Sequence, residues 1–79
     1  MSDSDTPTLS TVGERLRALR QKRGMSQVLL ADLSGVSHTS IHLWETGKKH
    51  PATKTLRPVA ELLGVTVEYL INGNEAEVL

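Results

Sequence analysis

The sequence SQVLLADLSGVSHTSIHLWETG, residues 26–47, predicts two short helices joined by one tight turn. Ser26 can cap the first helix, because its hydroxyl can accept hydrogen bonds from the free amides of the first helical turn. This helix is expected over residues 27–34, and its apolar residues are Val28, Leu30, Ala31 and Leu33. Gly35 follows it, at a position where the left-handed backbone that ends many helices costs little only for glycine.

The turn consists of Gly35, Val36 and Ser37. Ser37 can cap a second helix over residues 38–46. Two short helices joined by a three-residue turn that begins with glycine have the composition of a helix-turn-helix. In the second helix Ile41, Trp44 and Glu45 lie on one side at helical spacing, and the two apolar residues are expected in the core.

The other side of this second helix is polar and almost uncharged, which favours contact with DNA bases. A helix fits the major groove, and short polar side chains near its N-terminus can reach base edges there. A neutral histidine can accept or donate a hydrogen bond, whereas a protonated histidine only donates. Leu43 would meet a thymine methyl group or a sugar if it is exposed, or join the core if the helical phase is shifted by one residue. The predicted base-reading residues are His38, Thr39, His42 and Leu43.

Motifs along most of the chain extend this pattern. They are Arg15-Leu16-Arg17-x-Leu19-Arg20, Gly24-Met25-Ser26-Gln27, Leu30-Ala31, Gly35-Val36-Ser37, Ile41, Trp44-Glu45-x-Gly47, Pro51, Leu62-Leu63-Gly64-Val65 and Tyr69-Leu70-x-x-Gly73. On these residues the chain resembles the DNA-binding domain of the Cro and phage-repressor family of bacterial helix-turn-helix regulators. The resemblance covers roughly residues 12–73 and departs at Ser34, where the family usually carries a larger apolar residue. It implies an all-α fold, a compact lambda-repressor-like domain of five helices.

The resemblance also implies roles for three polar residues. Arg20 would pair with Glu45 and fix the angle at which the 38–46 helix is presented; the alternative is a solvated arginine. Gln27 stands at the first position of the 27–34 helix, where its side chain and the free amides can meet a DNA phosphate. The alternative for Gln27 is an ordinary exposed residue at a helix start.

Further phosphate contacts are predicted on either side of the 38–46 helix. Lys48 and Lys49 lie in the loop that follows it, where they would add affinity without sequence information. The alternative is a charged loop that only meets solvent. Ser37 and Ser40, at the start of the helix, suit capping and phosphate contacts better than base reading.

The charge distribution favours DNA although the formal net charge is zero. All nine Lys and Arg residues lie between positions 15 and 57, and only four acids lie between positions 13 and 63. This part of the chain therefore carries nine minus four, or +5 charges. Local charge steers association with DNA more than the total charge does.

The composition excludes disulfides and disfavours a metal site. The chain has no Cys, which excludes a disulfide framework and a cysteine zinc site. His38 and His42 stand one helical turn apart and His50 follows, but a good zinc site needs further ligands that are not evident. We therefore expect no metal and no other cofactor.

The first helix is predicted from its cap and its apolar spacing. Thr11 and Glu14 form a capping-box pattern for a helix that reaches about residue 23. Its buried stripe is expected at Val12, Leu16 and Leu19. Its cations are expected in solvent, and these are Arg15, Arg17, Lys22 and Arg23.

Two helices are predicted after the helix-turn-helix. Thr55 is the preferred cap of a helix over about residues 56–63, because Pro58 then falls in the first turn, where it is harmless. If Thr53 were the cap, the helix would begin tightly or bent. Thr66 can cap a last helix over about residues 67–71.

The predicted organisation is one domain between two tails. Residues 1–9 are expected to be disordered, residues 10–73 to form the helix-turn-helix domain, and residues 74–79 to be flexible. Related repressors imply a homodimer on DNA through the end of the domain. An apolar patch there would be built by Val65, Val67, Tyr69 and Ile71, although simple packing in the core explains these residues equally well.

These observations predict a sequence-specific double-stranded DNA-binding transcriptional regulator, and among such regulators they favour a repressor. It would insert the 38–46 helix into the major groove as a twofold dimer on a near-palindromic operator. The alternative is a protein-interaction module on the same fold, such as an antitoxin-like partner-binding protein. Such a face would tolerate acids, yet residues 38–43 contain none.

Other classes of protein are disfavoured. Catalysis is not expected, because the chain offers no acid paired with a histidine in a cleft and no glycine loop for a phosphate; no small-molecule ligand is evident either. No apolar run approaches the ~20 residues of a membrane span. The polar, acidic N-terminus is unlike a secretory signal, so we expect a cytoplasmic, nucleoid-associated protein.

Overall fold

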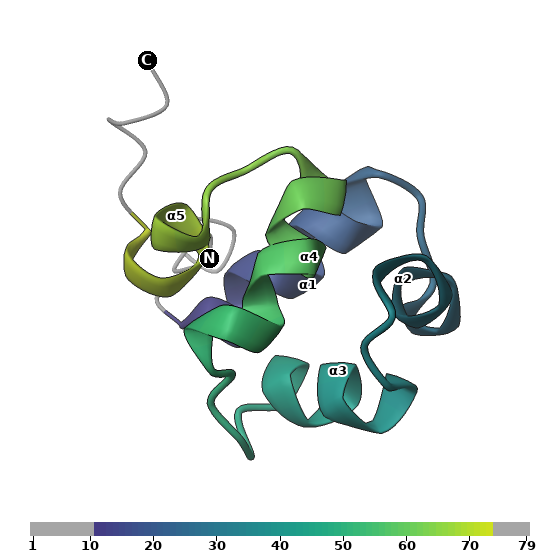
Figure 1. Ribbon diagram of the computed structural model, residues 1–79, viewed down its shortest axis with the longest axis horizontal. Helices are drawn as coiled ribbons and strands as arrows, with labels where there is room; N and C mark the ends of the chain where they lie inside the picture. The colour runs from purple at the N-terminus through teal and green to yellow at the C-terminus, as the bar shows by residue number, and fades with distance from the viewer. Residues whose placement is uncertain (1–10, 74–79) are drawn as a thin grey trace, which may run out of the picture.

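The computed structural model describes residues 11–73, so both predicted tails (residues 1–9 and 74–79) lie outside the described residues. The described part is all-helical, as predicted (Figure 1). Its helices are α1 (Val12–Lys22), α2 (Gln27–Ser34), α3 (His38–Glu45), α4 (Thr53–Leu63) and α5 (Val67–Asn72). The predicted fold of five helices is therefore confirmed.

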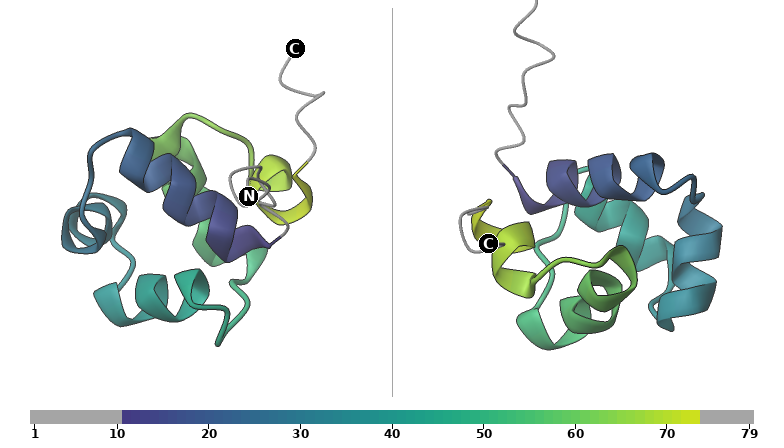
Figure 2. Two further views of the ribbon diagram at one scale, coloured as in Figure 1. Left: turned by 180° about the vertical axis from the view of Figure 1, so that it is seen from behind. Right: turned by 90° about the horizontal axis from the view of Figure 1, so that it is seen from above.

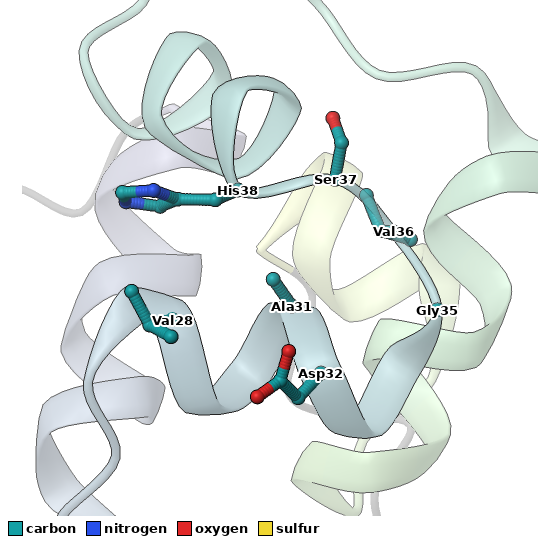
Figure 3. Close-up of a pocket in the computed structure, with 7 residues that line it drawn as sticks. All are labelled: Val28, Ala31, Asp32, Gly35, Val36, Ser37 and His38. Atoms are coloured by element: carbon teal, nitrogen blue, oxygen red, sulfur yellow. The ribbon is translucent and has the colours of Figure 1, made fainter.

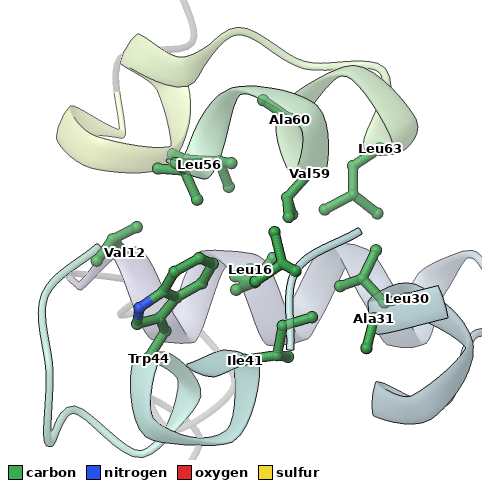
Figure 4. Packing of buried hydrophobic residues seen from close by; sticks show 12 residues of the cluster. Val12, Leu16, Leu30, Ala31, Ile41, Trp44, Leu56, Val59, Ala60 and Leu63 are labelled. Carbon is green, nitrogen blue, oxygen red and sulfur yellow. The ribbon is translucent and has the colours of Figure 1, made fainter. Parts of the chain in front are cut away.

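The helices enclose one small core. α1 and α4 occupy the middle of the molecule, with α2 and α5 at opposite ends and α3 along one edge (Figures 1 and 2). α3 packs against α1 and α2, and α5 packs against α1 and α4. Figure 4 shows residues of α4 facing those of α1, α2 and α3 across the core. The fully buried large side chains are Leu16, Leu30, Ile41, Leu56, Val59, Leu63 and Leu70.

Local capping explains where most helices begin. Each capping hydroxyl accepts a hydrogen bond from the backbone amide three residues later, which satisfies a donor that the helix itself cannot use. The N-cap residues with this bond are Thr11, Ser26, Ser37 and Thr66. At Thr11 the Glu14 carboxylate also accepts from the capping residue's amide, which completes the predicted capping box.

α4 begins earlier than predicted, and the choice of Thr55 as its cap was wrong. The helix begins at Thr53, and its N-cap is Ala52, which has no side chain to cap it. Pro58 therefore lies inside the helix, where it cannot donate the usual bond to the carbonyl of Lys54. Burial of the apolar side of α4 in the core outweighs the local preference, as tertiary packing often does.

Arg15 is buried, so its predicted position in solvent was wrong. Its Nε donates to the carbonyl of Leu70 at 2.8 Å, and its Nη2 donates to the carbonyl of Ile71 at 2.7 Å. Both carbonyls belong to the last turn of α5, where they have no partner within the helix. Arg15 thus fastens α5 to α1.

Arg23 acts similarly at the end of α4. Its side chain is exposed overall, as predicted, but Nη2 donates to the carbonyl of Leu63 at 2.6 Å and Nε to the same oxygen at 3.1 Å. Leu63 is the last residue of α4, and its carbonyl needs a partner from outside the helix. Cations near a helix C-terminus also complement the helix dipole.

α1 and α3 approach each other closely at Gly13. A Cβ atom at this position would overlap the carbonyl oxygen of Trp44 and lie 3.1 Å from the Cα atom of Glu45. Only a residue without a side chain lets the two backbones come this near. The absence of a side chain at Gly13 therefore sets the short distance between α1 and α3.

Substitution Gly13→Ala should lower the free energy of unfolding by about 3 kcal/mol, because overpacking against rigid backbone is costly. Helix propensity alone predicts the opposite sign, a gain of about 0.5–1 kcal/mol. Urea unfolding followed by the fluorescence of Trp44 measures the change. The exposed Arg17→Ala on the same helix is the control and should change stability by less than about 0.5 kcal/mol. A stabilised Gly13→Ala variant would contradict the close approach.

Candidate nucleic-acid interface

α3 divides into a buried side and an exposed side. Ile41, Trp44 and Glu45 are buried and attach the helix to the core. On the other side His38, Thr39 and His42 are exposed, and Leu43 is half-buried. The four residues predicted to read bases therefore include three accessible polar side chains and one partly accessible apolar one.

Arg20 and Glu45 form a buried ion pair between α1 and α3. Nε of Arg20 lies 2.7 Å from Oε2 of Glu45, and Nη2 lies 2.9 Å from Oε1, so the contact is bidentate. The remaining Nη1 donates to the carbonyl of Met25 at 2.7 Å. The Glu45 side chain is only 2% exposed, so the pair is shielded from solvent screening.

The hydrogen bonding of the Arg20 guanidinium to the Glu45 carboxylate raises the pKa of Arg20 above its ordinary value, against the opposing effect of burial. A group with a raised pKa in the folded state stabilises the fold below that pKa and loses this contribution only as the pH rises through it. For an arginine this occurs far above physiological pH. The arginine of the pair thus stays charged over the working range, and α3 keeps its angle to α1.

Gln27 links Glu45 to the exposed start of α3. Its Nε2 lies 3.0 Å from Oε1 of Glu45, and its Oε1 lies 3.1 Å from Nε2 of His38. Gln27 occupies the first position of α2 and His38 the first position of α3, so the turn brings two helix starts together. Sequence reasoning missed this contact, because it depends on the angle between α2 and α3, which residue spacing does not specify.

Ser37 and Ser40 are connected to each other at the start of α3. Ser37 Oγ accepts from the backbone amide of Ser40 at 3.1 Å, and the two hydroxyl oxygens are 3.0 Å apart. Ser37 is exposed and Ser40 half-buried. Their capping geometry orders the first turn of α3, and the exposed Ser37 hydroxyl remains accessible beside it.

The loop after α3 holds Lys48 and Lys49 next to the exposed side of the helix. Their backbone amides donate to the carbonyl of Leu43 at 2.9 and 3.2 Å. Thr46 Oγ1 donates to the carbonyl of His42 at 2.9 Å, and Gly47 adopts φ = 79°, which glycine tolerates. Both lysine side chains are exposed. The loop backbone is thus tied to the last turn of α3, and two cations lie at its end.

The turn between α2 and α3 borders a hollow of about 430 Å³ (Figure 3). It is lined by Val28, Ala31, Asp32, Gly35, Val36, Ser37 and His38.

At Ser34, where the sequence departs from the family pattern, the hydroxyl accepts from the amide of Val36 at 3.2 Å. A polar residue here therefore supports the turn through a hydrogen bond in place of apolar packing.

Among the apolar residues of α2, Leu30 and Ala31 are buried, whereas Val28 and Leu33 are 52% and 54% exposed. The neighbouring Leu29 is also 42% exposed. α2 thus carries apolar surface outside the core.

Over residues 11–73, no three His, Cys, Asp or Glu side chains gather in a way that could hold a metal ion. In the same range no helix has the length and apolar character needed to cross a membrane.

A protein-family model described as a helix-turn-helix matches residues 16–70. The chain belongs to the helix-turn-helix family of phage repressors and bacterial transcriptional regulators. The predicted family is thereby confirmed. This helix-turn-helix domain is similar in sequence to YonR, an HTH-type transcriptional regulator derived from the SPbeta prophage of Bacillus subtilis. The two are 37% identical over 65 residues, which cover 82% of this chain and 60% of YonR.

Solved structures of regulators bound to DNA share the fold of this helix-turn-helix domain. The c2 repressor of Salmonella phage P22, in complex with a synthetic operator, matches with a TM-score of 0.77 and 32% identity over 82% of this chain and 98% of that one. SinR, a master regulator for biofilm formation in complex with DNA, matches with a TM-score of 0.73 and 28% identity, covering 76% and 97%. The curated relative YonR is longer, and the matched region spans less than two thirds of it.

Proposed function

We propose that this domain is a sequence-specific DNA-binding transcriptional regulator that inserts α3 into the major groove and acts as a repressor. The observation that carries the proposal is the exposed side of α3, polar and without acids, followed directly by two exposed lysines. Helices of this kind read base edges, and neighbouring cations bind the phosphates. The relatives bound to operator or DNA support the same reading.

The base-reading residues in this proposal are His38, Thr39, His42 and Leu43. The phosphate contacts come from Gln27, Ser37, Ser40, Lys48 and Lys49. Gln27 can serve although it already contacts Glu45, because its amide carries two donor hydrogens and that contact uses one. Half-buried Leu43 offers the edge of its side chain to a thymine methyl group or a sugar.

The dimer belongs to the same proposal. A twofold dimer would place two copies of α3 about 34 Å apart, one helical turn of DNA, on a near-palindromic site. Val65, Val67, Tyr69 and Ile71 are half-buried and packed against the core, so each keeps part of its surface for a second copy. A regulator with this function acts on the bacterial nucleoid.

Substitutions Thr39→Ala and His42→Ala should each abolish the base preference at one position of each half-site. A lost base contact removes about 1–3 kcal/mol of discrimination, a factor of roughly 5 to 150. Binding to a panel of duplexes with single base changes measures this. Arg17→Ala, exposed on α1, should leave all preferences unchanged. Uniform weakening across the panel would assign these residues to phosphate contact, and no weakening would place α3 outside the groove.

A protein-interaction module on the same fold is the second candidate. The exposed apolar residues of α2, Val28, Leu29 and Leu33, are the observation that favours it. Exposed apolar surface often marks a contact with another protein. The lysine variants described in the Discussion separate the two functions, because a protein partner on α2 need not respond to charges after α3.

A further inference from the structure

A chain of hydrogen bonds runs from the core to the first residue of α3. It begins at the buried pair of Arg20 and Glu45 and continues through Gln27 to His38. Two of these groups, the amide of Gln27 and the imidazole of His38, change their hydrogen-bonding role with orientation or proton position, whereas a carboxylate paired with a guanidinium only accepts. The role of each group can therefore be assigned in turn from Glu45 outward.

The first assignment concerns the amide of Gln27. The atom that lies 3.0 Å from Oε1 of Glu45 must be a donor, because this carboxylate oxygen already accepts from Arg20 and offers no hydrogen. It is therefore the amide nitrogen, and the flipped orientation, which would set two oxygens against each other, is excluded. The carbonyl oxygen of Gln27 consequently faces His38.

The second assignment concerns His38. Its Nε2 lies 3.1 Å from the Gln27 oxygen, which can only accept, so Nε2 must carry a hydrogen. In a neutral imidazole one ring nitrogen is the donor and the other the acceptor. Nδ1 of the exposed His38 is therefore the ring nitrogen left as an acceptor.

We propose that Gln27 holds His38 in the Nε2–H tautomer and so makes it select a base that presents an amino group. This inference rests on the proposed function, in which the exposed side of α3 meets base edges. In the major groove adenine N6 and cytosine N4 are donors, whereas guanine and thymine present acceptors. Gln27 is then a positioning residue for base choice, in addition to its phosphate contact.

The tautomer is measured on the free protein by nitrogen–proton correlation of the imidazole rings at pH 8. We expect His38 with its proton on Nε2, and in Gln27→Leu a shift of His38 toward the tautomer mixture of His42, an exposed histidine on the same helix. Asp32→Asn is the matched control, because Asp32 lines the same hollow but stands outside the chain of hydrogen bonds, and it should change nothing. A His38 proton on Nδ1, or no change in Gln27→Leu, would overturn the proposal.

The base choice is measured by selection from a random duplex pool, where the position read by His38 is the one whose preference disappears in His38→Ala. We expect roughly fivefold enrichment of adenine or cytosine there, the size of one neutral hydrogen bond, and loss of that enrichment in Gln27→Leu. Loss of a phosphate contact alone would weaken all sequences equally and leave the base choice intact. Guanine or thymine at this position would refute the inference while leaving the proposed function standing, whereas failure to enrich any repeat would refute the proposed function.

Discussion

Replacing Glu45 by leucine should lower the free energy of unfolding by about 3 kcal/mol, since removal of one partner leaves the other charge buried and unpaired. The side chain of Arg20 is only 10% exposed. In this variant it would keep its hydrogen bond to the carbonyl of Met25 but lose both contacts to the carboxylate. Urea unfolding followed by Trp44 fluorescence measures the loss, because Trp44 is the single tryptophan and is buried beside Glu45.

The double variant Arg20→Met with Glu45→Leu is the control for this experiment. Buried ion pairs replaced on both sides by apolar residues of similar size often keep most of their stability. We therefore expect the double variant to be more stable than Glu45→Leu alone. A loss below about 1 kcal/mol in the single variant would show that the pair contributes no more than a surface pair.

Removing the charges of Lys48 and Lys49 together should weaken DNA binding at every sequence. Each phosphate contact contributes about 0.9 to the slope of log affinity against log salt. Two lost contacts should lower the slope by about 1.8 per domain and reduce affinity roughly 60-fold at 0.1 M salt. Titration of an operator duplex at several salt concentrations gives both quantities. The selected base sequence should stay the same, because phosphate contacts carry no sequence information.

Lys22→Ala supplies the matched control for the lysine variant. Lys22 is exposed and belongs to the last turn of α1. This end of α1 lies at the edge of the molecule away from α3 (Figure 1). Its removal changes the net charge by one unit without touching the proposed interface. The slope of log affinity against log salt should therefore stay unchanged. Equal effects of Lys22→Ala and of a single Lys48→Ala on this slope would mean that only the total charge matters. The loop after α3 would then make no specific phosphate contact.

The parts of the structure that are decided locally could be predicted from the sequence. The caps at Thr11, Ser26 and Ser37 depend on a hydroxyl and an amide three residues away, so the sequence shows both partners. The apolar spacing likewise placed Ile41 and Trp44 in the core. These are short-range rules, and the fold class follows from them.

The errors arose where distant elements meet. Arg15 looked like a solvated cation, because the carbonyls it binds lie 55 and 56 residues further along the chain and become its partners only when α5 docks. The predicted start of α4 was wrong because the burial of its apolar side outweighs the local cost of Pro58 inside the helix. The contact between Gln27 and His38 depends on the angle between α2 and α3, which no residue spacing specifies.

Selection from a random duplex pool at about 0.1 M salt is the most direct test of whether α3 reads a DNA sequence. We expect an enriched inverted repeat whose half-sites lie about ten base pairs apart, one helical turn. Retention of DNA that is salt-sensitive but enriches no sequence would contradict it. That result would leave a basic domain without base readout and would make the interaction module the leading function.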